Sequence, residues 1–430
     1  MSSVSNPIKA SPDFIADPYH SFEESNGDKL WSIVRSPIQA VAMHFLKDSI
    51  YYASSENFKK RLDERRLQES RDALFEIGGE EVLLETEDGC LIDSMFFDVN
   101  SFKRKIEELG GAFVNSGGER HIEIASGRLH RLMSKMNANI SGNMIELPKI
   151  QTDQEISHEP NVMILTQGNA GIYATNRLDI LRFLLKGMSI MVFDIRGTGR
   201  STGTPSEAGT YNDIEAVYQY LKLMKKFSND RIHVWGYCLG SGPATELAYR
   251  HPGVNLYIDR AAARVTDIAT DVAEIAALGN QQPNESTIVG ASRAAIRAVL
   301  PAVLDKTVIS YNNAEKIAKI RGRIFFLYGS YDNVIPPWSS DRLDERLSEE
   351  NTANSDRFIV IDSIGHGDDW SFAAEDTLNS YMGNVGACSV RVFPETDTRT
   401  DLEKLEEIID GVEEFREGFF QVLSRKLIQN

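Results

Sequence analysis

The chain has 430 residues, with 46 Lys and Arg against 63 Asp and Glu, which gives a net charge of −17. This length predicts two or three domains, or one large domain with insertions, and it is enough chain for a full hydrophobic core. No apolar run approaches the roughly 20 residues of a membrane helix, so we expect a soluble protein, with peripheral membrane contact left open. The acidic balance repels polyphosphates and argues against nonspecific nucleic-acid binding.

Three cysteines, Cys90, Cys238 and Cys388, are spread along the chain. An odd and widely spaced set forms neither a disulfide framework nor a paired metal-ligand spacing, so no metal is expected. The same sparse usage predicts a reducing, cytoplasmic compartment. Residues 1–18 are polar and lack an apolar run, which predicts that there is no secretory signal peptide.

The first 78 residues are expected to form an N-terminal helical extension. Apolar side chains at positions 31, 34, 38, 41 and 45 recur at spacings of three and four, which indicates one face of a helix. Pro37 falls inside this run and either kinks the helix or marks a restart. Residues 61–71 are highly charged and contain no helix breaker, so we expect a solvated helical face there.

A β-hairpin is predicted next, with strands at 81–86 and 91–97. Asp88-Gly89 between two apolar runs is a strong hairpin signal. Residues 101–109 are expected to form a short helix that ends at Gly110-Gly111. From there to residue 160 the pattern assigns no element clearly.

From residue 161 apolar strands alternate with amphipathic helices. The expected strands are 162–166, 188–193, 232–237, 254–258, 324–328 and 358–361, and the expected helices are 173–185, 211–224 and 241–250. This alternation predicts an α/β fold, with a mostly parallel sheet covered by helices on both faces.

An alanine-rich helical stretch at about 260–320 interrupts the alternation, with its clearest helices at 261–277 and 291–303. An insertion so late in the sheet would lie over the ends of the strands, as a cap or lid. We therefore divide the chain into the extension at 1–78 and one domain at 79–430 that carries this insertion. A last helix is expected at 403–426.

The segment Gly236-Tyr237-Cys238-Leu239-Gly240 follows an apolar strand and opens a helix. A nucleophile between two such glycines, in that context, forms a nucleophile elbow. The turn is sharp, so side chains at 236 and 240 would clash with their neighbours, and Cys238 is pushed out at the carboxyl edge of the sheet. The helix N-terminus beside it favours a thiolate. The alternative is that Cys238 is only a small buried residue of a tight turn.

A nucleophile needs a base, and the base needs an orienting acid. Asp332 lies in the loop after the strand at 324–328, and His366 lies between two glycines after the strand at 358–361. Taken alone, Asp332 could be a turn residue and His366 a loop histidine, but the chain order of nucleophile, acid and histidine favours a catalytic set. His251 is interpreted as a helix C-terminal residue, and His233 as a satisfied strand histidine.

Acyl transfer also needs donors for the oxyanion that develops on the carbonyl. One candidate is the N–H of Leu239, the residue after the nucleophile. The other is the N–H of Asn169 or Ala170, in the loop after the strand at 162–166, where Gly168 lets the backbone turn inward. The alternative for this loop is an ordinary βα turn that contains a glycine.

The loop that begins at Asp194 is rich in glycine but matches neither G-x-G-x-x-G nor G-x-x-x-x-G-K-[ST]. A Rossmann or P-loop interpretation therefore fails. We expect a structural role for this loop, with Asp194 and Arg196 holding the turn.

These motifs together resemble those of the α/β-hydrolases, over residues 161–367 and the hairpin. The matching segments are Gln167-Gly168-Asn169-Ala170, the loop at 194–201, Gly236-Tyr237-Cys238-Leu239-Gly240, Tyr328-Gly329-Ser330-Tyr331-Asp332 and Gly365-His366-Gly367. The long extension and the sequence at 236–242 more narrowly resemble bacterial hydrolases of the CHLPS and SidB types, some of which are translocated effectors. Two residues depart from the common pattern: Cys238 replaces Ser, and Gln167 replaces His.

The residues and the resemblance lead to one hypothesis, a Cys-His-Asp hydrolase that cleaves an ester or thioester through a covalent acyl-enzyme. Cys238 attacks the acyl carbonyl, His366 transfers the proton and later activates water, and Asp332 orients His366. The expected partner is a small-molecule or lipid acyl substrate, as for an esterase, thioesterase or lipase, and no cofactor is implied. Two further hypotheses stay open: a noncatalytic scaffold that binds a partner or lipid, and an acyltransferase with the same triad.

Overall fold

A computed structural model describes residues 8–9 and most of residues 64–382. Within the second span it omits residues 117–118, 125, 137–139, 142–143, 147–159, 170, 279–286, 308–309, 333, 351–356, 372–373, 375–376 and 379–380. The periodic positions 31–45, the helix expected at 403–426 and Cys388 lie outside the described residues.

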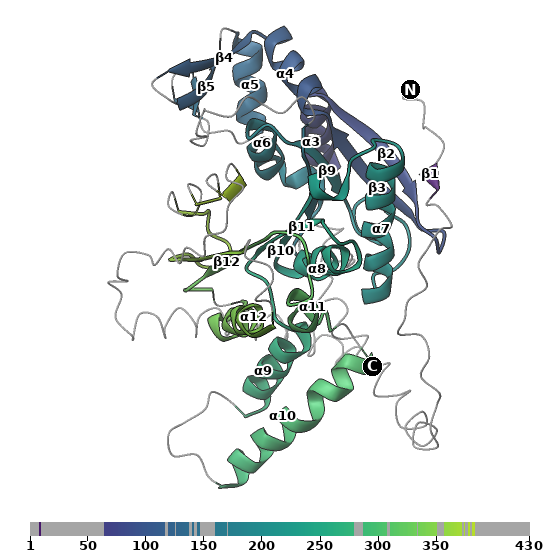
Figure 1. Ribbon diagram of the computed structural model, residues 1–430, viewed down its shortest axis with the longest axis vertical. Coiled ribbons are helices and arrows are strands. Elements are labelled where there is room, and N and C mark those ends of the chain that lie inside the picture. Colours follow the sequence, from purple (N-terminus) through teal and green to yellow (C-terminus); the bar gives the residue numbers. More distant parts are fainter. Residues whose placement is uncertain are drawn as a thin grey trace.

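The fold is built on a nine-stranded sheet in the order β1-β2-β3-β9-β8-β10-β11-β12-β13 (Figure 1). The strands are β1 (Ile8–Lys9), β2 (Gly79–Glu85), β3 (Leu91–Phe97), β8 (Val162–Thr166), β9 (Ser189–Phe193), β10 (Ile232–Tyr237), β11 (Asn255–Asp259), β12 (Ile324–Gly329) and β13 (Arg357–Asp362). β2 and β3 form the predicted antiparallel hairpin, and β3 pairs antiparallel with β9. The six strands from β9 to β13 run parallel, which confirms the predicted α/β fold.

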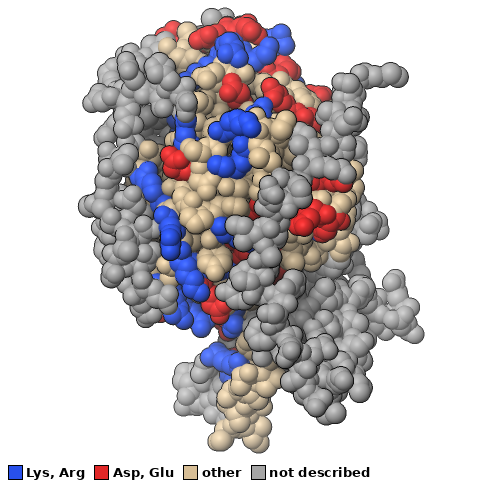
Figure 2. All heavy atoms as spheres, turned by 45° about the vertical axis from the view of Figure 1, so that its right-hand side comes forward, with Lys and Arg blue, Asp and Glu red and all other residues tan. Residues whose placement is uncertain are grey.

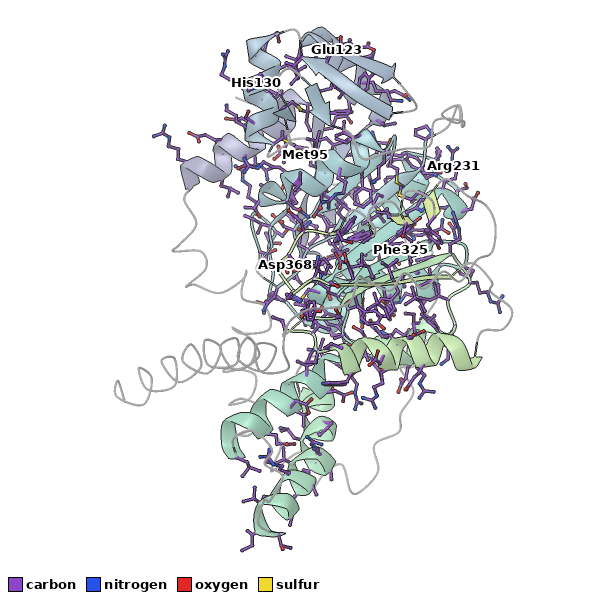
Figure 3. The ribbon with its side chains drawn as sticks, turned by 90° about the vertical axis from the view of Figure 1, so that its left-hand side faces the viewer. Met95, Glu123, His130, Arg231, Phe325 and Asp368 are labelled. Atoms are coloured by element: carbon purple, nitrogen blue, oxygen red, sulfur yellow. The ribbon has the colours of Figure 1, made fainter. Side chains whose placement is uncertain are left out.

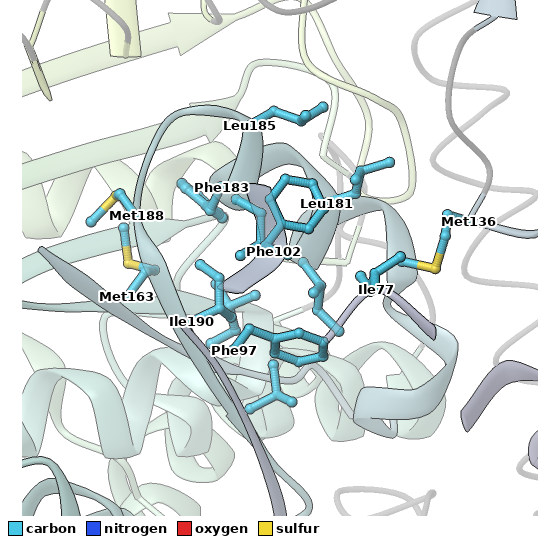
Figure 4. Packing of buried hydrophobic residues seen from close by; sticks show 14 of the residues in the cluster. Ile77, Phe97, Phe102, Met136, Met163, Leu181, Phe183, Leu185, Met188 and Ile190 are labelled. Atoms are coloured by element: carbon cyan, nitrogen blue, oxygen red, sulfur yellow. The ribbon is translucent and has the colours of Figure 1, made fainter. Parts of the chain in front are cut away.

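Both faces of this sheet are buried. The helices packed around it are α3 (Glu64–Glu76), α6 (Arg177–Leu185), α7 (Glu207–Leu223), α8 (Ser241–Arg250), α11 (Asn313–Ile317) and α12 (Pro337–Glu350). Successive strand residues point to opposite faces, so Trp235 joins one hydrophobic core and Val234 the other. In the first core, Phe97 and Ile190 of the strands pack with Phe183 of α6 (Figure 4). Burial on both faces explains why these strands are continuous apolar runs.

Several helices begin at other residues than the pattern indicates; α6, for example, starts at Arg177 rather than at 173. Two of these differences have a clear physical cause. Helix α7 starts at Glu207 rather than at 211, because the Ser206 hydroxyl caps it and accepts the N–H of Gly209 at 3.1 Å. The helix expected from 261 starts at Val265. The residues before it form a buried loop in which the N–H of Ala263 donates to Ser339 Oγ at 2.9 Å, so a tertiary contact overrides helix propensity.

A second, four-stranded sheet occupies the region that the pattern leaves unassigned. It is antiparallel, in the order β4-β5-β7-β6, with β4 (Gly111–Ser116), β5 (Glu119–Ile124), β6 (Ile140–Ser141) and β7 (Met144–Glu146). Helices α4 (Val99–Glu108) and α5 (Gly127–Lys135) accompany it, at the top of Figure 1. Ile122 and Leu129 extend the first core into this unit. The short, polar strands carry too little periodicity to be predicted.

The interpretation of residues 61–71 as a solvated face is wrong for its last two residues, Ser70 and Arg71, which are buried. The Arg65–Glu69 pair on α3 is exposed, but the Arg71 side chain is only 2% exposed. Arg71 Nη1 donates to Asp93 Oδ2 at 2.7 Å, and its guanidinium also pairs with Glu81. A buried cation needs such partners, and both carboxylates belong to the β2–β3 hairpin. These ion pairs therefore join α3 to the hairpin.

The predicted insertion contains α9 (Val265–Leu278) and α10 (Thr287–Thr307), which pack on each other and project beyond the sheet (Figure 1). We call this pair the α9–α10 arm. Buried Glu274 of α9 joins it to α10 by pairing with Arg293 at 2.9 Å and Arg297 at 2.6 Å. The end of the arm, at the foot of Figure 2, is mostly uncharged, and Ile288 there is 80% exposed. Its role as a lid stays a prediction. Among the described helices, none is both long and apolar enough to cross a bilayer.

Candidate active site

The three predicted catalytic residues lie at one edge of the sheet. Cys238, Asp332 and His366 follow the carboxyl ends of β10, β12 and β13, and parallel strands bring these ends together. The strand register keeps the ends nearly level, since Tyr237 pairs with Asp259 of β11. Figure 3 marks both edges: Asp368 follows β13 on one side of the sheet, and Arg231 precedes β10 on the other.

Cys238 sits on a strained turn. Its φ is +51°, in the left-handed region that residues other than glycine rarely adopt. A short 3-10 turn (Cys238–Gly240) leads directly into α8. Two hydroxyls hold the turn: Ser241 Oγ donates to the Cys238 carbonyl at 2.6 Å, and Thr166 Oγ1 lies 2.8 Å from the Gly240 carbonyl. This is the geometry that the nucleophile-elbow motif predicts.

Both elbow glycines stand where a side chain has no room. A Cβ added at Gly236 would lie 2.6 Å from Ser241 Cα, and one at Gly240 would lie 2.7 Å from the Gln167 carbonyl oxygen. Real Cβ atoms do not approach so closely. The close approach of β10, α8 and the loop after β8 therefore depends on these two glycines.

The structure brings Asp332 and His366 into hydrogen-bond contact. Asp332 Oδ2 lies 2.8 Å from His366 Nδ1, and the carboxylate is almost fully buried. Its other oxygen accepts the backbone N–H groups of Val334 at 2.9 Å and Ile335 at 2.7 Å. These bonds orient the carboxylate toward Nδ1 of His366, so Asp332 does not engage Nε2 of the imidazole.

The environment of His366 favours the charged imidazolium. Burial lowers the pKa of His366, but hydrogen bonds and charge from Asp332 and Cys238 outweigh burial and raise that pKa from 6.5 to about 10. These contacts therefore favour the protonated form of the imidazole. A protonated histidine suits a partner that is already a thiolate, whereas a serine hydroxyl needs a neutral base.

Two residues that the sequence pattern does not single out hold the His366 loop. The hydroxyl of Tyr237 donates to the His366 carbonyl at 2.6 Å, and Arg260 Nη1 donates to the same carbonyl at 2.8 Å. The only sequence signal is their place, at or just beyond the ends of β10 and β11. Only the register of β10 and β11, in which Tyr237 pairs with Asp259, shows that the two residues lie side by side.

The loop after β8 lies against the elbow. A Cβ at Gly168 would meet the Tyr237 ring at 2.9 Å and Cys238 Cβ at 3.5 Å. The N–H of Gly171 donates to the Gly168 carbonyl at 3.0 Å and closes the turn. The side chain of Gln167 accepts from Asn176 Nδ2 at 2.9 Å, which ties the loop to the start of α6.

The predicted oxyanion donors lie on two segments beside Cys238. Leu239 is half-buried beside Cys238 and packs against a small cluster around Tyr211 and Tyr311. Asn169 belongs to the loop that contacts the elbow, and Ala170 lies outside the described residues. Donation by Leu239 and Asn169 to an oxyanion stays a prediction.

The two other histidines near the sheet have structural partners. His233 Nδ1 lies 3.0 Å from the Tyr257 hydroxyl, and burial lowers the pKa of His233 to about 3. His251, after the last residue of α8, lies 2.8 Å from Glu215. The interpretation of His251 as a helix C-terminal residue is confirmed. His233 is satisfied only at Nδ1, because its buried Nε2 has no hydrogen-bond partner. Among the described residues, no group of three or more His, Cys, Asp or Glu is arranged to hold a metal ion.

Comparisons with known proteins agree with this architecture. Residues 161–308 match the family model described as the alpha/beta hydrolase fold, a span that contains the elbow and ends before Asp332 and His366. The parallel sheet and the elbow place the protein in the class of proteins with the α/β-hydrolase fold.

Individual relatives match only part of the chain. An uncharacterized protein of Mycobacterium tuberculosis, Rv2307c, is 27% identical over 206 residues, 48% of this chain and 63% of that protein. The lysophosphatidylserine lipase ABHD12 of Rattus norvegicus is 35% identical over 100 residues, 23% of this chain and 24% of the lipase. The match thus spans less than two thirds of these relatives. A crystal structure of an alpha-beta hydrolase from Vibrio vulnificus aligns with 89% of this chain and 96% of its own at 15% identity and a TM-score of 0.46.

Proposed function

We propose that the protein is a cysteine hydrolase that cleaves an ester or thioester through an acyl-enzyme on Cys238. The observation that carries this proposal is the arrangement around His366. Its Nδ1 is held 2.8 Å from Asp332 Oδ2, and Cys238 is among the groups that raise the pKa of the same ring. A nucleophile, a base and an orienting acid in that order are the minimum set for acyl transfer.

The first half-reaction uses the charge of His366. The Cys238 thiolate attacks the acyl carbonyl, a C–S bond forms, and the carbonyl electrons move onto the oxygen. The N–H groups of Leu239 and Asn169 are the proposed donors to that oxyanion. When the tetrahedral intermediate collapses, the imidazolium gives its Nε2 proton to the departing alkoxide or thiolate. An acyl thioester on Cys238 and a neutral His366 remain.

The second half-reaction returns the enzyme to its starting charge. Neutral His366 takes a proton from water as the hydroxide adds to the thioester. The intermediate then expels the Cys238 thiolate and releases the acid, and the imidazolium is restored. Asp332 holds the ring through both steps and stabilises its charged form.

Two observations support an ester or thioester as the substrate. A thiolate nucleophile suits activated esters and thioesters, where the leaving group is stable. The relatives named lysophosphatidylserine lipases support the inclusion of lipid esters. The narrower resemblance to CHLPS and SidB types, and an effector role, stay predictions.

Hydrolysis of a substrate panel tests the proposal. The panel contains short and long p-nitrophenyl esters, acyl-CoA thioesters and lysophosphatidylserine, and the proteins are the wild type, Cys238→Ala and the control Cys90→Ala. Cys90 is also a half-buried thiol, in the hairpin turn. We expect Cys90→Ala to retain activity and Cys238→Ala to lose at least about a thousandfold in kcat/KM. Equal rates for the wild type and Cys238→Ala on every substrate would refute the proposal.

The same samples separate the two other hypotheses. A trapped acyl group on Cys238 whose turnover requires an added alcohol or amine identifies an acyltransferase. No turnover, together with equally slow iodoacetamide labelling of Cys238 and Cys90, identifies a noncatalytic scaffold, because a thiolate paired with a cation reacts faster than an ordinary thiol.

A further inference from the structure

We infer that Arg260 is a positioning residue that fixes the loop carrying His366 and thereby sets the approach of the imidazole to Cys238. The inference rests on the contact of the Arg260 guanidinium with three backbone carbonyls of that loop. The inference rests on the proposed function only in assuming that His366 serves Cys238.

Arg260 lies at the centre of the active-site edge. It directly follows β11, the strand between the one that carries the nucleophile and the one that precedes the acid. Its side chain is 5% exposed, and its φ is +49°, in the left-handed region. The N–H of Arg260 donates to the Leu327 carbonyl of β12 at 2.8 Å, which anchors the backbone. A strained, buried arginine at such a place is typical of a functional site.

The side chain divides its donors between two tasks. Nε and Nη2 form a bidentate pair with Asp259 Oδ1 and Oδ2 at 2.8 and 2.9 Å. Nη1 faces the loop and donates to the carbonyls of Gly365 at 3.0 Å, His366 at 2.8 Å and Asp368 at 2.8 Å. The planar guanidinium is held by one set of bonds and clamps the loop with the other, which a lysine ammonium cannot reproduce.

The neighbouring residues link this clamp to the nucleophile. Tyr237, which precedes Cys238, donates its hydroxyl to the His366 carbonyl at 2.6 Å, and the Arg260 cation lies 4.9 Å from the centre of the Tyr237 ring. Trp370, farther along the loop, donates to Asp259 Oδ2 at 2.9 Å. The His366 loop is therefore tied to the ends of both β10 and β11.

The groups that face His366 define what a displaced loop would change. They are Asp332 after β12, Cys238 and Tyr237 of the elbow, and Arg260 after β11. If the carbonyl of His366 loses one of its two donors, the ring no longer holds one position relative to Cys238. A displacement of about 1 Å is enough to cost about a hundredfold in rate.

The test measures the iodoacetamide alkylation rate of Cys238, resolved by peptide mass, between pH 5 and pH 9. The proteins are the wild type, Arg260→Met, His366→Ala and a matched control, Arg323→Met. Arg323 precedes β12 at the opposite edge, donates to the Tyr381 carbonyl at 2.7 Å and lies over the Tyr381 ring at 4.2 Å. Like Arg260, it donates to a backbone carbonyl and lies over a tyrosine ring, but it does so away from the active site.

We expect Arg260→Met to slow alkylation at pH 6 by about tenfold or more and to leave the rate at pH 9 nearly unchanged, which shifts the profile toward that of His366→Ala. Arg323→Met will keep the wild-type profile. Arg260→Met leaves the Asp259 carboxylate buried without its cation, so Asp259→Asn/Arg260→Met is made in parallel, since it removes both charges and keeps an acceptor for Trp370. Folding of each variant is checked by circular dichroism.

The outcomes separate this inference from the proposed function. If His366→Ala shifts the profile and both Arg260 variants keep the wild-type profile, Arg260 does not position His366 and the inference is overturned. The proposed interaction of His366 with Cys238 then still stands. If His366→Ala itself leaves the profile unchanged, His366 does not act on Cys238 and the proposed function fails. If Arg323→Met shifts the profile as Arg260→Met does, the effect is a general loss of structure and the inference is again overturned.

Discussion

Replacing Asp332 by asparagine tests whether the buried pair with His366 contributes to the stability of the folded protein. The amide oxygen of the new side chain can still accept the N–H groups of Val334 and Ile335, so the change removes mainly the negative charge beside the imidazolium. In the wild type that charge helps to raise the pKa of His366 to about 10, from 6.5. The folded state thus binds a proton that the unfolded chain releases between pH 6.5 and 10. Stability from this pair is complete below pH 6.5 and is lost as the pH rises through 10.

The size of the effect follows from the two pKa values. The shift is worth about 5 kcal/mol when fully expressed, about 4 kcal/mol at pH 7 and less than about 1 kcal/mol at pH 10. Cys238 supplies part of it. We therefore expect Asp332→Asn to lower the free energy of unfolding by about 2–4 kcal/mol at pH 7 and by less than about 1 kcal/mol at pH 10.

Urea unfolding followed by circular dichroism at pH 6, 7, 8, 9 and 10 measures this difference. The matched control is Glu274→Gln in the α9–α10 arm. Glu274 is equally buried, but its partners Arg293 and Arg297 stay charged over this range, so its loss will cost the same at every pH. A stability loss for Asp332→Asn that is equally large at pH 7 and pH 10 would refute the reasoning.

Two further predictions concern the elbow. Gly240→Ala places a methyl group 2.7 Å from the Gln167 carbonyl oxygen, so we expect a loss of about 1–3 kcal/mol in urea unfolding, whereas Gly290→Ala, where nothing lies within 4 Å, will be neutral or slightly stabilising. Cys238→Gly relieves the left-handed strain at φ +51°, so it will be more stable than Cys238→Ala by about 1 kcal/mol and will unfold at a higher temperature, although both variants lack the thiol. An equal or lower unfolding midpoint would show that the turn stores no strain.

The sequence predicts well the elements that are defined by local pattern. The strands at 162–166 and 232–237 and the helix at 241–250 have the same bounds in the structure, because a doubly buried strand is one apolar run and the elbow motif marks the strand-to-helix change. The placement of Asp332 and His366 after separate strands follows from the same alternation. Their 2.8 Å contact could only be expected, since it depends on how two loops fold together.

What the sequence does not predict depends on distant contacts. Arg71 looks like one more surface charge until α3 is docked against Asp93, 22 residues away. Arg260 is one arginine among many, and its partner loop lies 105 to 108 residues further along the chain. Neither periodicity nor a motif carries such information, because it arises from the strand register and from the packing of loops at the sheet edge.

The strand order also decides how the site is lost. β13, which leads to His366, is the last strand in the order and pairs only with β12 among the described strands. Edge strands open by local unfolding at a lower free energy than central ones. Fraying of β13 therefore separates His366 from Cys238 while β8, β10 and β11 stay paired. In mild denaturant, amide hydrogen exchange will become fast in β13 before it does in β8, β10 and β11, and the reactivity of Cys238 will fall before the sheet melts.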